Sequence, residues 1–210
     1  MRDFIITEIH IENFRSLADV YVPLRKQTVL IGENNSGKTS FLDAFALVFA
    51  ESDARFSADD IFLEADRSLV PRDRKACVDI RIEPAGGEKE FKDETRGLFG
   101  EAIQLGTGNE KDYIAIRAEL GWDKAREEYR RSRSFLKGWA RKKTEAGQIQ
   151  ILTRPTLRRD FLELFPFIIL MPSAIFRINS TRVNPFGENW PAIFNSMMIF
   201  RKRLKKRFMM

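Results

Sequence analysis

Residues 32–39, Gly-Glu-Asn-Asn-Ser-Gly-Lys-Thr, have the types and spacing needed to bind phosphate groups. They match the pattern Gly-x-x-x-x-Gly-Lys-Ser/Thr in full. Gly32 allows a tight turn at the end of a strand, and Gly37 allows the backbone to approach a phosphate closely. The successive N–H groups from Asn35 to Ser40 are expected to converge as an anion-binding nest. The pattern therefore predicts a phosphate-binding loop, with a glycine turn before an ordinary helix as the alternative.

Two side chains in this loop predict the rest of the chemistry. The ammonium of Lys38 is expected to reach the β and γ phosphates as a compact positive charge. The hydroxyl of Thr39 is expected to coordinate Mg²⁺, which keeps water and phosphate oxygens as its other ligands. A helix that begins near Lys38 would add the positive end of its dipole to the same place.

The surrounding elements must hold this loop between a strand and a helix. Residues 27–32 form a short apolar run that ends in glycine, which is typical of a buried strand. Residues 38–50 place Phe41, Phe45 and Phe49 on one helical face, which predicts a largely buried helix. Alternation of apolar and polar residues predicts further strands over 4–14, 18–24, 75–84 and 112–122. A turn and a partner strand are expected after 84, an irregular segment over 93–110 and a strand over 148–152. Ser57 as a cap predicts a short helix, and Pro155 near a first turn predicts a helix over 155–165.

The residues on both sides of the loop resemble a known family. The runs I-x-x-I-x-I-E-N-F-R-S-L, from Ile6, and V-L-I-G-E-N-N-S-G-K-T-S-F-L-D-A, from Val29, are similar to the amino-terminal lobe of RecF/SMC-type ATPases. Within that group the chain most resembles the OLD (overcoming lysogenisation defect) ATP-dependent nucleases. The resemblance implies an α/β P-loop NTPase of the ABC/SMC-head type, with a mixed sheet packed on the P-loop helix and incomplete in this chain. It also implies ATP and Mg²⁺ as cofactors, a homodimer that encloses ATP between two heads, and DNA as a partner of the intact relative.

The resemblance also assigns site residues. Lys38 is expected to be catalytic, and Thr39 to hold the metal. Arg15 matches an arginine that lies near the phosphates or base of the nucleotide in relatives, and a surface arginine at a strand end is the alternative. The full set of expected nucleotide-binding residues is Arg15, Gly32, Asn34, Asn35, Ser36, Gly37, Lys38, Thr39 and Ser40.

Several parts of a complete ATPase are not found in the sequence. ATP hydrolysis needs an apolar strand that ends in Asp-Glu, to hold Mg²⁺ and position the attacking water. No such run occurs, and neither does an ABC-type signature motif or a carboxylate-rich nuclease domain, and the last acidic residue is Glu188. We therefore expect ATP binding by half of a site, with enzymatic activity uncertain. The alternatives are a RecF/SMC-type repair ATPase without nuclease, a small P-loop kinase and a stand-alone ATP-binding adaptor.

The last 40 residues differ in composition from the rest. Residues 171–210 carry eight Lys/Arg and one Asp/Glu, for +7, whereas the remainder carries 28 and 29, for −1. Five of the six methionines also lie there. We therefore divide the chain into an ATPase lobe over 1–166 and an atypical basic tail over 167–210. Plausible codons for the tail, read one base earlier, restore motifs of the relatives, which favours a shifted reading frame near 166–170. A basic extension that binds nucleic acid is the alternative.

Composition bounds the remaining possibilities. A single cysteine, Cys77, cannot form an intramolecular disulfide, which fits a cytoplasmic setting. The longest apolar run, 164–176, is shorter than the roughly 20 residues that span a bilayer, so no membrane partner is expected. Cys77 is interpreted as core packing, and His10 as an improbable catalytic or metal residue. Asp59 and Asp60 are interpreted as acids at a helix start rather than a metal pair. Residues 124–143 hold nine Lys/Arg against two Glu and could contact DNA, although a solvated helix face is the commoner explanation.

Overall fold

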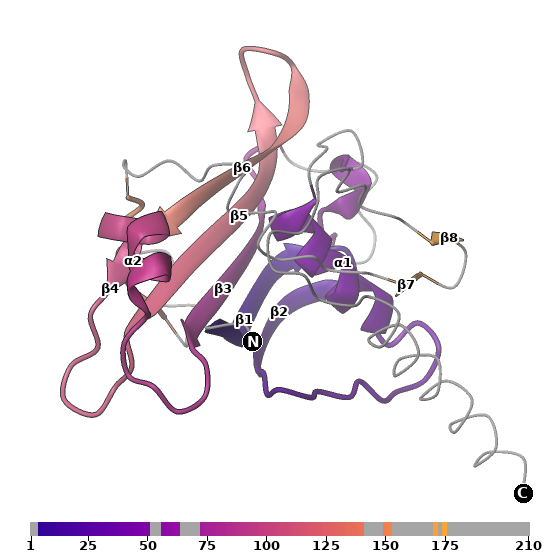
Figure 1. Ribbon diagram of the computed structural model, residues 1–210. Helices are drawn as coiled ribbons and strands as arrows, with labels where there is room; N and C mark the ends of the chain where they lie inside the picture. Colours follow the sequence, from indigo (N-terminus) through magenta and orange to yellow (C-terminus); the bar gives the residue numbers. More distant parts are fainter. Residues whose placement is uncertain are drawn as a thin grey trace, which may run out of the picture. The chain divides into compact units, whose positions relative to one another are not determined.

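The computed structural model describes residues 4–50, 56–63, 72–140 and 149–152, together with four strand positions near residue 172. A six-stranded sheet runs in the order β2-β1-β3-β5-β4, and β6 pairs with the free part of β5 (Figure 1). Every pairing in it is antiparallel. The elements are β1 (Phe4–Phe14), β2 (Leu17–Pro23), α1 (Lys38–Phe49), η1 (Ala58–Asp60), β3 (Ala76–Pro84), α2 (Asp93–Phe99), η2 (Gly100–Ala102), β4 (Ile103–Gln104), β5 (Tyr113–Asp123) and β6 (Glu128–Leu136), with a short pair β7 (Leu170–Met171) and β8 (Ala174–Ile175).

One face of the sheet is apolar and belongs to the same hydrophobic core as α1. Side chains two residues apart on a strand point to the same face. Ile9 and Ile11 on β1 and Ile80 on β3 are therefore together in this core, and each is fully buried. Leu47 and Val48 of α1 are fully buried in the same core. The core thus fixes the helix that follows the predicted phosphate-binding loop.

The other face of the sheet carries a network of charged side chains. Arg117 of β5 donates two hydrogen bonds to the carboxylate of Asp79 on β3, at 2.8 and 2.7 Å. Glu8 of β1 accepts a hydrogen bond from the indole of Trp139 at 2.7 Å. Asp79 and Glu8 are buried, so these partners replace the water that the carboxylates lose on folding. The hydrogen bond from Arg117 to Asp79 also raises the pKa of the guanidinium.

Most of the predicted elements are confirmed. The α/β class is confirmed. The bounds of four strands and one helix lie within one or two residues of those predicted, namely β1, β2, β3, β5 and α1. Ser57 caps the short helix η1, because its hydroxyl accepts a hydrogen bond from the backbone N–H of Asp59 at 3.2 Å. Asp60 completes this capping box, which agrees with its interpretation as a helix-start acid. Ile151 forms only an isolated bridge with Leu136, and the helix predicted over 155–165 lies outside the described residues.

The strand predicted over 27–32 is wrong. These residues form no ladder with any described strand, and the side chains of Val29 and Ile31 are 59% and 90% exposed. An apolar run becomes a buried strand only where neighbouring strands satisfy its N–H and C=O groups. Among the described residues no strand pairs with this segment, although β2 leaves one edge of the sheet open.

Three further predictions, for the segment after 84, for 93–110 and for the charged segment after 123, are wrong. The segment after β3 forms no partner strand, and the segment over 93–110 contains α2, η2 and β4 rather than irregular chain. Phe99 anchors α2 with ring contacts to Phe4 and Phe135, both at 6.4 Å. The charged segment after 123 is strand β6 rather than a helix face. Its inward positions include Arg131, which breaks the apolar alternation expected of a strand.

Candidate functional site

The loop over 32–39 leads directly into α1, as its sequence predicts. Gly37 has a left-handed backbone with φ +86° and is the residue before the first turn of the helix. Asn35 is also left-handed, with φ +65°, a conformation that asparagine tolerates better than most residues. No side chain caps the amino end of α1. The first N–H groups of the helix therefore remain available to an anion.

Lys38 folds back over this loop. Its ammonium donates to the carbonyl oxygen of Gly32 at 2.7 Å, to the carbonyl oxygen of Glu33, and to the hydroxyl of Ser36 at 3.1 Å. An added Cβ at Gly32 would lie 2.6 Å from the Ser36 Oγ, so the Ser36 hydroxyl would have to rotate away from its hydrogen bond with Lys38. The positive charge thus lies on the concave side of the loop, where a phosphate would bring negative charge.

The remaining predicted loop residues are open to solvent. Asn34, Asn35, Ser36 and Thr39 are exposed, and Thr39 is the second residue of α1. Ser40 lies one residue further and its hydroxyl is 2.8 Å from that of Ser16 in the turn between β1 and β2. The backbone N–H of Ser36 donates to the carbonyl oxygen of Glu33 at 3.2 Å within the loop. The exposed Thr39 hydroxyl has the oxygen chemistry that Mg²⁺ accepts.

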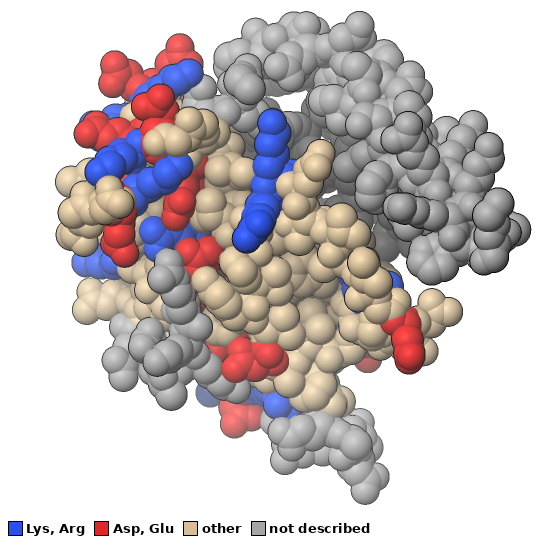
Figure 2. Space-filling view, turned by 90° about the horizontal axis from the view of Figure 1, so that it is seen from below, with Lys and Arg blue, Asp and Glu red and all other residues tan. Residues whose placement is uncertain are grey.

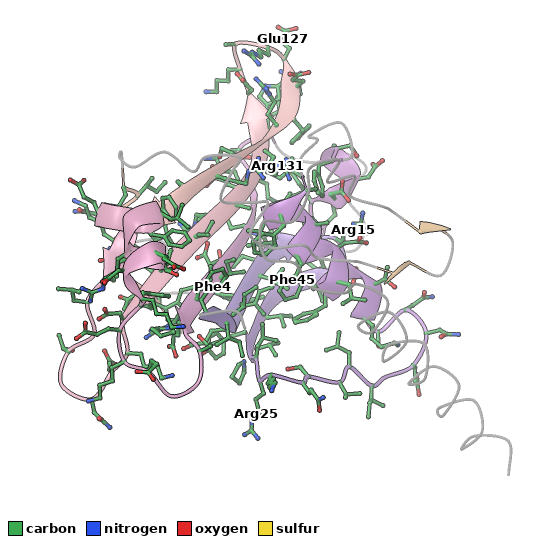
Figure 3. The ribbon with its side chains drawn as sticks, in the orientation of Figure 1. Phe4, Arg15, Arg25, Phe45, Glu127 and Arg131 are labelled. Atoms are coloured by element: carbon green, nitrogen blue, oxygen red, sulfur yellow. The ribbon has the colours of Figure 1, made fainter. Side chains whose placement is uncertain are left out.

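Arg15 lies in the turn between β1 and β2, beside α1 (Figure 3). Its Nε donates to the Asp60 carboxylate at 2.7 Å, and its Nη1 donates to the carboxylate of Asp43 on α1. Asp43 is fully buried and Asp60 nearly so, which makes this arrangement an internal tie between η1, the turn and α1. Two of the nitrogen atoms of Arg15 are therefore engaged by protein carboxylates, and its role toward a nucleotide stays a prediction.

The other candidates from the sequence have structural partners. His10 Nε2 lies 2.8 Å from the Oδ1 of Asp19 and 3.7 Å from the Oε1 of Glu12, so the fold does bring acidic groups to this histidine. In the part of the chain that the structure describes, these three residues are the group with metal-ligand geometry. The hydrogen bond to Asp19 satisfies the buried imidazole without an ion. The interpretation of Cys77 as core packing is wrong, since its thiol lies near Glu119 on the charged face of the sheet.

Two arginines that the sequence did not indicate lie at the carboxyl end of α1, the end opposite the phosphate-binding loop. Arg131 on β6 donates to the carbonyl oxygens of Ala46 and Leu47 at 3.3 and 3.1 Å. Arg133 donates to those of Val48 and Ala50, both at 3.1 Å. These four oxygens belong to the carboxyl end of α1. A sequence signal exists in retrospect, because the last turn of α1 contains no basic residue of its own.

The fold and the loop define a P-loop NTPase built on an antiparallel sheet. Comparison with protein families supports this class, because residues 5–137 match the AAA ATPase domain. The match spans more than half of the chain, and the protein belongs to this family. No curated protein matches the chain.

Among solved structures, one similar chain comes from a study described as structural biochemistry of ATP-driven dimerization and DNA-stimulated activation of SMC ATPases. It has 20% sequence identity to this chain and a TM-score of 0.45. The similarity covers 79% of this chain and 86% of that one. Among the described residues, no helix is long and apolar enough to cross a membrane.

Proposed function

We propose that this chain binds ATP with Mg²⁺ through residues 32–40. The observation that carries the proposal is the loop geometry, in which Lys38 lies over the loop carbonyls while the amino end of α1 has no side-chain cap. In this arrangement the Lys38 ammonium would exchange carbonyl oxygens for the β and γ phosphates, and Thr39 would coordinate Mg²⁺. The AAA ATPase family supports nucleotide binding as the basic activity.

Titration with a fluorescent ATP analogue tests this function, with and without Mg²⁺. Lys38→Ala removes the phosphate-binding charge and is expected to weaken binding at least about tenfold, the equivalent of one ion contact of about 1.4 kcal/mol. Lys26→Ala is the matched control, because Lys26 is an exposed lysine in the segment that precedes the loop. Equal affinity of the Lys38 variant and the wild type would contradict the proposal.

We further propose that the lobe belongs to an OLD-like ATPase in the cytoplasm, in which ATP closes two heads and controls DNA cleavage in the intact relative. The resemblance in the runs from Ile6 and from Val29 supports this assignment. The shifted reading frame near 166–170 is part of the same proposal. The structure describes no side chains of the tail over 167–210 that could test it. Sequencing the gene from codon 160 onward decides it. A neighbouring frame that closes at once would leave the tail as a genuine basic extension.

The alternative of a non-nuclease RecF/SMC-type ATPase shares this lobe, and the downstream reading frame distinguishes the two. A small P-loop kinase has less support, because its P-loop strand would be central to a parallel sheet. All pairings described around the loop are antiparallel. Gel filtration with light scattering, with and without ATP, tests the proposed head-to-head dimer.

A further inference from the structure

The P-loop helix is tied to neighbouring elements along its flank and at its carboxyl end. Its flank is tied to Arg15 through the buried carboxylate of Asp43. Its carboxyl end receives four hydrogen bonds from Arg131 and Arg133 of β6. Its amino end lacks a side-chain cap and begins at the left-handed Gly37.

We propose that Arg131 and Arg133 are positioning residues of the nucleotide site, acting through α1. This inference deepens the proposed ATP-binding function and rests on it. The two guanidinium groups are separated from the phosphate-binding end by the length of a 12-residue helix, roughly 18 Å. They would therefore not touch the nucleotide, and their effect would pass through the orientation and the dipole of the helix.

The physical basis is the set of carbonyl oxygens at the end of a helix. The last four C=O groups of an α-helix have no partner within the helix, and they carry its partial negative charge. Helix α1 has no basic residue in its last turn, so β6 supplies the cations instead. The Arg131 residue is only 7% exposed, and burial of a guanidinium is costly unless its donors are paired. The carbonyl oxygens of Ala46 and Leu47 are among the acceptors that pair it.

Strand β6 also connects this end of the helix to the rest of the sheet. It pairs with β5 along its whole length, from Ala115↔Leu136 to Asp123↔Glu128. Figure 3 shows Arg131 between this hairpin and α1, with Glu127 at the tip of the hairpin. A rigid helix fixed to a rigid hairpin presents its first N–H groups in one orientation, which lowers the reorganisation needed to bind a phosphate.

The experiment compares Arg131→Gln/Arg133→Gln with a matched control on the same strand. Arg130→Gln is that control, since Arg130 faces the opposite way, is partly exposed and lies 3.5 Å from Glu128. ATP affinity is measured by calorimetry at a temperature where circular dichroism shows each variant to be fully folded. We expect the double variant to bind ATP about five- to tenfold more weakly, from two cations at a helix end, and Arg130→Gln to bind as the wild type does.

A second readout separates positioning from mere stabilisation. The backbone amide signals of Gly37 and Lys38 are compared in ¹H–¹⁵N spectra without nucleotide, and they should shift in the double variant but not in Arg130→Gln. Arg131→Lys/Arg133→Lys keeps both charges and should restore most of the affinity, and the single variant Arg133→Gln, at the less buried of the two positions, replaces the Gln pair if that pair does not fold. Unmoved amide signals, or unchanged affinity in a folded Gln pair, would overturn the proposal. If the wild type binds no ATP, the proposed function fails, whereas the amide signals still test the positioning role.

Discussion

Replacement of Gly37 by alanine tests whether the loop depends on close packing as well as on a left-handed backbone. Gly37 has φ +86°, and an added Cβ would lie 2.8 Å from the Cδ2 of Leu17 and 3.4 Å from the Oγ of Ser16. The left-handed backbone alone costs a non-glycine residue about 1–2 kcal/mol. The contact with Leu17 is closer than real Cβ contacts allow, so the Leu17 side chain at the start of β2 must move, and overpacking adds about 1–3 kcal/mol. We expect a total loss of about 2–5 kcal/mol in the free energy of unfolding.

Gly87→Ala isolates the backbone term. Gly87 has φ +92°, nearly the value of Gly37, but an added Cβ there meets nothing within 4 Å. Urea denaturation of both variants should therefore show a cost of about 1–2 kcal/mol for Gly87→Ala and a larger one for Gly37→Ala. The difference should shrink when Leu17→Ala is added to Gly37→Ala, because a smaller side chain relieves the overlap. Equal costs at the two glycines would refute the argument that the β1–β2 turn packs against the loop.

Two further predictions concern the charged face of the sheet. Asp79→Ala leaves the Arg117 guanidinium without its bidentate partner and should lower the free energy of unfolding by about 3–5 kcal/mol in a urea titration. Lys75→Ala removes the exposed ion pair with Glu119 and should cost less than about 1 kcal/mol in the same titration. Equal losses in the two variants would contradict the argument from burial. Burial raises the pKa of the Cys77 thiol from 9.0 to about 12, so the folded thiol stays protonated while the unfolded thiol ionises above pH 9. This contribution to stability is complete below pH 9 and is lost as the pH rises toward 12. By pH 10 the free energy of unfolding of the wild type should therefore fall by about 1–1.5 kcal/mol more than that of Cys77→Ala. Parallel pH profiles of the two proteins would exclude this contribution of the thiol.

Predictions from the sequence succeeded where a local pattern was enough to determine structure. The alternation in β1 and β3 and the phenylalanine spacing of α1 each specify one buried face, and tertiary contacts did not override them. The turn chemistry of the loop was equally local, since Gly37 and Asn35 both have the left-handed backbone that their residue types favour. The position of the candidate site, in the loop before α1, follows from these local features of the sequence.

The failures lie where structure depends on distant partners. Residues 27–32 have the composition of a strand, but a strand exists only with a neighbour, and the described sheet provides none. The contacts of Arg15 with Asp43 and Asp60, which lie 28 and 45 residues away in the sequence, could not be predicted either, and its role toward a nucleotide stays a prediction. No periodicity analysis brings such residues together. The position of Arg131 depends in the same way on a helix 84 residues earlier.

The structure also changes how the basic segment over 124–143 should be interpreted. Of the nine basic residues in 124–143, Arg131 and Arg133 donate to the backbone of α1. A third, Arg130, lies beside Glu128. Acidic and basic side chains are also interspersed on the face shown in Figure 2, where they gather at the end that bears α2 and β4 rather than forming a surface of one sign. Cations paired with protein groups release no counterions from DNA, and counterion release is the main source of nonspecific affinity. Among the described residues of this segment, a DNA-binding role therefore has to be sought in the exposed Lys124, Arg126 and Lys137, and not in its count of arginines.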